Sequence, residues 1–169
     1  MKSNIKTVVA TNPYGEKFTV SVDSLELSAH VYGVAIDGDK VLISPQHGGY
    51  DWPGGTMELG ETHIETLKRE YKEETGLDVE PTRLLNVFSG FYHSKTKNHN
   101  RQSILIYYLV KIIGGEISTD GFDDEEKEYA SVAEWKTLGE IKKMHHACSL
   151  DAKDHLVACV KQAMEEDKK

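Results

Sequence analysis

The stretch GGTMELGETHIETLKREYKEETGL, residues 54–77, is the most informative part of this chain. It contains a Gly-Gly turn and a short polar loop, followed by a run of residues with helical periodicity. At about 3.6 residues per turn, four side chains of this run fall on one apolar stripe: Ile64, Leu67, Tyr71 and Thr75. Glu61 or Thr62 suits the beginning of such a helix, and Gly76 is a natural stop after it. The sequence therefore predicts a glycine turn that leads into one amphipathic helix.

Three carboxylates of this helix lie close together. Glu70, Glu73 and Glu74 stand at positions i, i+3 and i+4, so their side chains converge on one face. Clustered hard oxygen donors are the ligands that Mg²⁺ or Mn²⁺ needs. Glu74 lies at the edge of the apolar stripe, and a partly buried carboxylate tends to protonate unless a cation accompanies it. A metal site is the simplest interpretation of this cluster.

An ordinary solvated helix is the alternative interpretation. Arg69 stands four residues after Glu65 and four before Glu73, and such i,i+4 ion pairs are common on exposed helices. The helix alone supports both interpretations about equally.

The spacing on either side of the helix favours the metal site. The segment resembles the Nudix box, whose pattern is G-x5-E-x7-R-E-U-x-E-E-x-G-U with U a bulky aliphatic residue. The matching positions are Gly55, Glu61, Arg69, Glu70, Glu73, Glu74, Gly76 and Leu77. One position departs from the pattern, because Tyr71 stands where an aliphatic residue is usual. We expect Tyr71 to pack on the apolar stripe and its hydroxyl to find a partner or solvent.

The resemblance implies an α/β fold, a Nudix-type α/β/α sandwich with a mixed β-sheet. It also implies a Mg²⁺-dependent (or Mn²⁺-dependent) hydrolase that cleaves the pyrophosphate linkage of a nucleoside diphosphate joined to another moiety. Nucleoside triphosphates, dinucleoside polyphosphates, ADP-ribose and nucleotide sugars all fit that description. Two alternatives on the same fold remain: a nucleotide-binding or regulatory module without turnover, and an isoprenoid diphosphate isomerase. The complete set of box carboxylates favours the enzyme over the binding module.

The resemblance also assigns roles within the box. Glu73 and Glu74 are expected as metal ligands, Glu70 as a ligand or the general base, and the main-chain carbonyl of Gly54 as a further ligand. Arg69 is expected to orient Glu61 or Glu70, with Glu61 acting as a brace between loop and helix. Because family members often use a further acid from a downstream loop, Glu126 and Glu128 of the acidic run 120–128 are candidates, although a solvated loop has the same composition.

Several residues outside the box are candidates for substrate binding. Lys95, Lys97 and Arg101 belong to a polar loop and could receive a distal phosphate or sugar, although a solubilising hairpin tip explains them as well. Trp52 and Tyr92 could stack on a base, although aromatic residues beside a glycine turn more often belong to the core.

Composition limits the remaining choices. A chain of 169 residues, 38% hydrophobic and 28% charged, suits one domain, here residues 1–169. A net charge of −8 argues against a nucleic-acid partner, while metal ions can still neutralise a small phosphorylated substrate. No apolar run approaches the roughly 20 residues of a membrane span, no signal peptide is evident, and two cysteines make no disulfide framework. We therefore expect a cytoplasmic protein with no membrane partner, either a monomer or a homodimer that pairs through its N-terminal hairpin.

The rest of the chain reads as strands followed by helices. A β-hairpin is predicted at about residues 5–22, around the turn Asn12-Pro13-Tyr14-Gly15. Further strands are predicted at His30–Ile36, Lys40–Ser44, Arg83–Phe91, Ser103–Ile113 and Ala130–Trp135, with Pro45 ending the second. C-terminal helices are predicted over about residues 137–164, as Thr137–His145 and Asp151–Met164.

Overall fold

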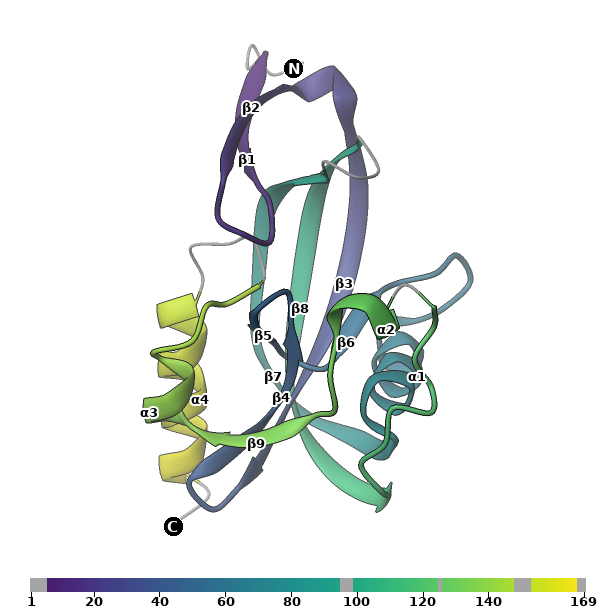
Figure 1. Cartoon of the computed structure of the whole chain (residues 1–169), viewed down its shortest axis with the longest axis vertical. Coiled ribbons are helices and arrows are strands. Elements are labelled where there is room, and N and C mark those ends of the chain that lie inside the picture. Colours follow the sequence, from purple (N-terminus) through teal and green to yellow (C-terminus); the bar gives the residue numbers. More distant parts are fainter. Residues whose placement is uncertain (1–5, 95–98, 125, 148–152, 167–169) are drawn as a thin grey trace.

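The computed structural model describes residues 6–94, 99–124, 126–147 and 153–166. Within these ranges, nine strands form one mixed sheet (Figure 1). The strands are β1 (Thr7–Thr11), β2 (Lys17–Ser21), β3 (Leu25–Asp37), β4 (Lys40–Gln46), β5 (Gly49–Asp51), β6 (Gly54–Thr56), β7 (Leu77–Ser94), β8 (His99–Gly115) and β9 (Glu134–Thr137). The helices are η1 (Val22–Ser24), α1 (His63–Thr75), α2 (Glu126–Tyr129), α3 (Leu138–Ile141) and α4 (Lys153–Glu166).

The sheet runs in the order β2-β1-β7-β8-β3-β4-β5, with β6 added to β3 and β9 added to β4. The β1–β7 and β3–β8 pairs are parallel, and the other pairs are antiparallel. Helix α1 lies on one side of the sheet, and α3 and α4 lie on the other (Figure 1). The predicted α/β/α sandwich with a mixed sheet is confirmed. No helix in the described ranges combines the length and the apolar character that crossing a lipid bilayer requires.

Strand β3 divides the interior into two cores because alternate side chains of a strand point to opposite faces. Val31 and Ala35 pack with Leu67 of α1, whereas Tyr32 and Val34 enter the core beneath α3 and α4. The second core also contains Trp52, which has no exposed surface.

The N-terminal hairpin was predicted correctly. Asn12 shapes its turn by accepting hydrogen bonds through Oδ1 from the backbone N–H groups of Tyr14 and Glu16, each at 3.0 Å. The hairpin joins the sheet by parallel pairing of Thr11 with Tyr92. Its tip is held against the C-terminal segment by a contact between the His145 ring and the carbonyl of Pro13.

Some predicted boundaries are wrong. β4 continues through Pro45 to Gln46, because the Pro45 carbonyl still accepts a hydrogen bond, here from the N–H of Ser131. The predicted strand Ala130–Trp135 is displaced to β9, and only Leu138–Ile141 of the predicted helix Thr137–His145 is helical. Thr137 explains that displacement, since it ends β9 and caps α3 by accepting from the N–H of Glu140.

Tyr71 packs against Gly33 where α1 crosses β3. The tyrosine has no exposed surface, and a Cβ placed on Gly33 would lie 2.7 Å from Cε2 of its ring. Its hydroxyl has no hydrogen-bond partner in the described part of the chain, so the expectation of a partner or solvent is wrong. The larger ring in this position is accommodated because β3 carries a glycine directly beneath it.

We predict that Gly33→Ala destabilises the protein by about 1–3 kcal/mol, the usual cost of overpacking a core. In a Tyr71→Leu background the same change should cost less, because leucine leaves room for the new methyl group. Denaturant unfolding of the four chains in a double-mutant cycle measures this coupling. Equal costs of Gly33→Ala in both backgrounds would contradict the prediction.

Candidate active site

Helix α1 is fixed at both ends by local signals in the sequence. Thr62 caps its beginning by accepting from the N–H of Glu65, and the Glu65 carboxylate in turn accepts from the N–H of Thr62. Gly76 ends the helix with a φ of 75°, a left-handed conformation that glycine adopts without strain. The carboxylates of α1 therefore sit on a well-defined helix.

The glycine turn brings the main chain unusually close to these carboxylates. A Cβ on Gly55 would lie 2.4 Å from Oε2 of Glu70, and one on Gly54 would lie 2.1 Å from the carbonyl oxygen of Val31. Gly54 also has a φ of 143°. A side chain is excluded at Gly54, whereas one at Gly55 would displace the Glu70 carboxylate, which packs against the backbone of β6.

Arg69 connects the loop to the helix. Its guanidinium holds both oxygens of Glu61, through Nε at 2.6 Å and a terminal nitrogen at 2.8 Å. The other terminal nitrogen lies 3.0 Å from a carboxylate oxygen of Glu70 and 3.0 Å from one of Glu73. The hydrogen bonds that Glu61 accepts lower its pKa to about 2; the largest effect comes from Arg69, followed by the N–H of Glu58 and the hydroxyl of Thr66. Arg69 therefore links Glu61 on the loop to Glu70 and Glu73 on the helix.

Glu74 occupies the floor of the cleft and is half-buried. Its Oε2 accepts hydrogen bonds from the N–H of Gly54 and the hydroxyl of Ser44, each at 3.1 Å. Burial raises the pKa of this carboxyl well above its usual value, and the charges of Glu70 and Asp51 raise it further. Glu74 is therefore a carboxylate whose negative charge is poorly compensated, as the helical pattern predicted.

Glu70, Glu73 and Glu74 line one open cleft of about 500 Å³. Asp123 also lines the cleft, because the backbone around Gly121 packs directly on α1: a Cβ on Gly121 would lie 2.4 Å from the carbonyl oxygen of Glu73. The cleft is predominantly polar and acidic, with Arg69 as its basic member.

The donor set suits a hard divalent cation. Mg²⁺ and Mn²⁺ prefer oxygen ligands, and the site offers carboxylate oxygens from one helix and backbone carbonyl oxygens from the neighbouring glycine turn. Among the described residues, however, no three His, Cys, Asp or Glu side chains are already gathered at metal-binding distance. Glu70 and Glu73 are turned toward Arg69 instead. Metal binding at this site therefore requires these two carboxylates to exchange part of their contact with Arg69.

A second, smaller cavity of about 180 Å³ adjoins the cleft, and we call it the inner cavity. Four residues line both spaces: His30, Tyr32, Gln46 and Asp51. Burial, together with the charge of Arg101, lowers the pKa of His30 to about 4, so this imidazole is neutral near pH 7. A ligand can therefore extend from the carboxylates into the inner cavity.

The structure separates the substrate-binding candidates. Tyr92 and Arg101 line the inner cavity. Trp52 is buried in the core and is not available to stack on a base, so the structure supports the core interpretation of this residue and not the stacking one. Lys95 and Lys97 lie outside the described residues.

The acidic run also differs from expectation. Glu128 is exposed on α2, and the side chain of Glu126 is not described. Asp123 of the same run lines the cleft, as do Asp51 and His30, and none of these three was selected from the sequence. Asp51 immediately precedes the Trp52-Pro53-Gly54 turn, which was the available signal.

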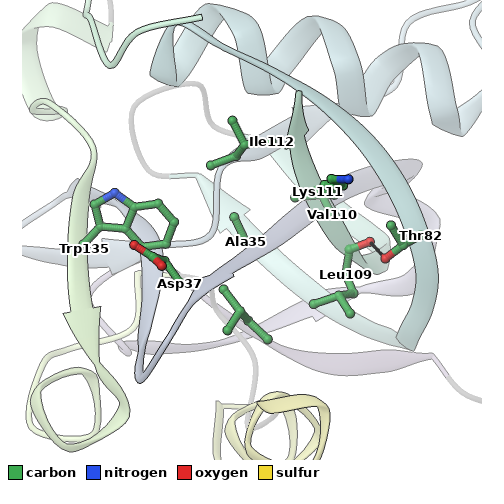
Figure 2. Close-up of a pocket in the computed structure, with 9 residues that line it drawn as sticks. Ala35, Asp37, Thr82, Leu109, Val110, Lys111, Ile112 and Trp135 are labelled. Atoms are coloured by element: carbon green, nitrogen blue, oxygen red, sulfur yellow. Dashed lines mark hydrogen bonds between the residues drawn. The ribbon is translucent and has the colours of Figure 1, made fainter. Parts of the chain in front are cut away.

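A third cavity, of about 630 Å³, is larger but lies away from this chemistry (Figure 2). Trp135, Asp37 and Lys111 are among its lining residues, and no box carboxylate is. Volume alone therefore does not locate the site, and the carboxylates do.

Comparison with known proteins identifies a matching domain family and similar chains. The model of the NUDIX domain matches residues 27–156. An ADP-ribose pyrophosphatase of Methanocaldococcus jannaschii is 31% identical over 137 residues, which is 72% of this chain and 78% of that protein. The human 8-oxo-dGDP phosphatase NUDT18 is 34% identical over 98 residues, 55% of this chain and 28% of that protein.

Solved structures share the fold. An ADP-ribose pyrophosphatase from Streptococcus suis superposes with a TM-score of 0.59 at 18% identity, covering 80% of this chain and 91% of that one. A UDP-X diphosphatase superposes with a TM-score of 0.59 at 15% identity, covering 82% of this chain and 64% of that one. At these identities the similarity concerns the fold alone.

We predict that Glu74→Gln stabilises the metal-free protein and removes its response to Mg²⁺. A carboxyl with a raised pKa destabilises the folded state when it is ionised, so the neutral amide should raise the melting temperature at pH 7. Mg²⁺ should raise the melting temperature of the wild type and not of the variant. Thermal unfolding with and without Mg²⁺ measures both effects, and a wild type that does not respond to the metal would contradict the proposed site.

The pKa of Glu61 predicts the acid range in which the Arg69 contact is lost. Because folding lowers the pKa of Glu61, its carboxylate stabilises the folded state at pH values above its unfolded pKa of about 4.5. This stabilisation is lost as the pH falls from about 4.5 toward the folded pKa of about 2. The melting temperatures of wild type and Glu61→Gln should therefore differ by a constant amount at pH 6–8 and converge below pH 4.5. A difference that persists to pH 2 would show that charge is not its source.

Proposed function

The chain belongs to the NUDIX family of pyrophosphohydrolases, and we propose that it hydrolyses a nucleoside diphosphate joined to another moiety, with Mg²⁺ or Mn²⁺. The observation that carries this proposal is the shared wall of the two spaces, formed by His30, Tyr32, Gln46 and Asp51. A diphosphate beside the carboxylates would leave its nucleoside within reach of the inner cavity. The size of that cavity supports this division, since pockets for whole ligands usually measure about 300–1,000 Å³.

Each box residue has a role in this proposal. Glu74, Glu73 and Glu70, with the carbonyl of Gly54, would hold the cation. The bound cation would neutralise phosphoryl oxygens and acidify the attacking water. Arg69 and Glu61 keep the loop against the helix, and Arg69 limits repulsion between Glu70 and Glu73.

The reaction itself is a displacement at phosphorus. The oxygen of water bonds to one phosphorus, and the bridging P–O bond breaks, so the bridging oxygen leaves with the other phosphate. A carboxylate of the cleft takes the proton of the water, and we assign this role to Glu70 or Glu73. The products are a nucleoside monophosphate and a phosphorylated second moiety.

The named relatives agree with this class of substrate. The M. jannaschii protein is an ADP-ribose pyrophosphatase and the human protein is an 8-oxo-dGDP phosphatase. Both names describe cleavage at a phosphoric anhydride of a nucleotide. We propose the same linkage for this chain.

We predict that the wild type releases a nucleoside monophosphate from at least one member of a panel of nucleotide sugars, ADP-ribose and nucleoside triphosphates in Mg²⁺. Glu73→Gln should lower kcat/KM by about 10²–10³-fold, the usual effect of removing one group that stabilises developing charge. Product formation is measured by chromatography.

Glu80→Gln is the matched control, because Glu80 is also ion-paired to α1, through Lys68, but lies outside the cleft. It should retain wild-type activity. Absence of turnover on the whole panel, with both variants folded, would reject the hydrolase in favour of a binding module.

A further inference from the structure

The inner cavity carries one positive and one negative side chain. Arg101 is half-buried in its wall, and no other described residue forms an ion pair or a side-chain hydrogen bond with it. Asp51 is buried in the same wall with 7% of its surface exposed. Since His30 is neutral near pH 7, the charges of Arg101 and Asp51 balance. The cavity therefore suits a neutral polar group better than a phosphate, which the Asp51 carboxylate would repel.

Asp51 is held in place from behind. Its Oδ1 accepts from the N–H of Trp52 at 2.8 Å and lies 3.3 Å from Nε2 of His146. Its Oδ2 makes no hydrogen bond with another described residue. A fixed carboxylate of this kind can accept two parallel hydrogen bonds from a ligand, as a carboxylate does from a guanidinium.

Arg101 and Asp51 approach the cavity from different elements. Arg101 projects from β8, where it pairs with Tyr92 of β7, and Asp51 ends β5. Both charges act on His30, Arg101 lowering its pKa and Asp51 raising it, so both lie near this ring. A planar ligand beside His30 would thus lie within reach of a bidentate donor and of a carboxylate acceptor.

We propose that the inner cavity binds a guanine base, an inference that rests on the proposed function and specifies its substrate as a guanine nucleotide. Guanine presents two acceptors, O6 and N7, on one edge, which match the donors of an arginine. It presents two donors, N1–H and the N2 amino group, on the next edge, which match a carboxylate.

The other bases match less well. Adenine presents an acceptor next to a donor on both edges. The Arg101 guanidinium would therefore face one donor, and the Asp51 carboxylate would face one acceptor. Uracil has one N–H between two carbonyl groups, which leaves half of the Asp51 carboxylate against an acceptor. Hypoxanthine has the same O6 and N7 acceptors for Arg101 as guanine, but it lacks the N2 amino group that would donate to Asp51. Comparing the two bases therefore measures the contribution of Asp51 without mutating the buried Asp51–His146 pair.

The test is calorimetric binding of GMP, IMP, AMP and UMP to the full chain without divalent metal. Wild type should bind GMP at least tenfold more tightly than AMP or UMP, with IMP between GMP and AMP. Arg101→Met should weaken GMP binding by about 10–100-fold and AMP binding far less, because a bidentate arginine–guanine contact discriminates by about 1–3 kcal/mol. Arg83→Met, which removes an exposed arginine paired with Glu166 away from the cavity, should change none of these affinities.

The inference would be overturned if AMP or UMP bound as tightly as GMP, if no monophosphate bound, or if Arg101→Met kept the guanine preference. Monophosphates have no linkage to hydrolyse, so their binding does not depend on the proposed function. Paired assays of GDP-glucose and ADP-glucose hydrolysis separate the two claims. Hydrolysis of both sugars at equal kcat/KM would overturn the inference and leave the hydrolase intact, whereas guanine-selective binding without turnover would overturn only the hydrolase.

Discussion

The site depends on how one guanidinium distributes its hydrogen bonds among three carboxylates. Arg69 holds Glu61 on the loop and Glu70 and Glu73 on its own helix. Without it, Glu70, Glu73 and Glu74 would repel one another within one helical turn, and the loop would lose its attachment to α1. No ion pair between Arg69 and Glu74 is found in the described part of the chain, and one oxygen of Glu74, Oε2, accepts hydrogen bonds from Gly54 and Ser44. The negative charge of Glu74 thus stays poorly compensated, whereas Glu70 and Glu73 are paired with the guanidinium of Arg69. A metal ion bound to these two carboxylates would take over part of that pairing.

Small residues decide how closely the surrounding chain approaches these charges. Gly55 lets β6 meet the Glu70 carboxylate, and Gly121 lets the acidic segment lie on the backbone of Glu73. The second contact places Asp123 in the wall of the cleft, although Asp123 is far from α1 in sequence. In the core, the absence of a side chain at Gly33 likewise leaves room for the ring of Tyr71.

Local patterns in the sequence were sufficient for the parts of the structure that local physics determines. The cap at Thr62, the stop at Gly76 and the hairpin turn at Asn12 each satisfy backbone groups within a few residues, so the pattern predicts them. The resemblance to the Nudix box implies that Arg69 orients Glu61 or Glu70, and Arg69 contacts both carboxylates. The inner cavity was not predictable in this way, because β3, β4, β5, β7, β8 and the hairpin tip each contribute one to three side chains to it. Trp52 shows the same limit: its neighbours in sequence allow both a stacking role and a core position, and only the tertiary packing decides for the core.

Asp51 makes the cleft and the inner cavity electrostatically dependent on each other. Its charge raises the pKa of Glu74 on one side and the pKa of His30 on the other. A cation among the box carboxylates would offset the repulsion between Glu74 and Asp51, so binding at the carboxylates would also change the electrostatic field in the inner cavity. Because coupling between two sites is reciprocal, a ligand beside Asp51 would in turn change the affinity of the carboxylates for the cation. A substrate that spans both spaces would then bring its diphosphate and the cation to the same carboxylates together.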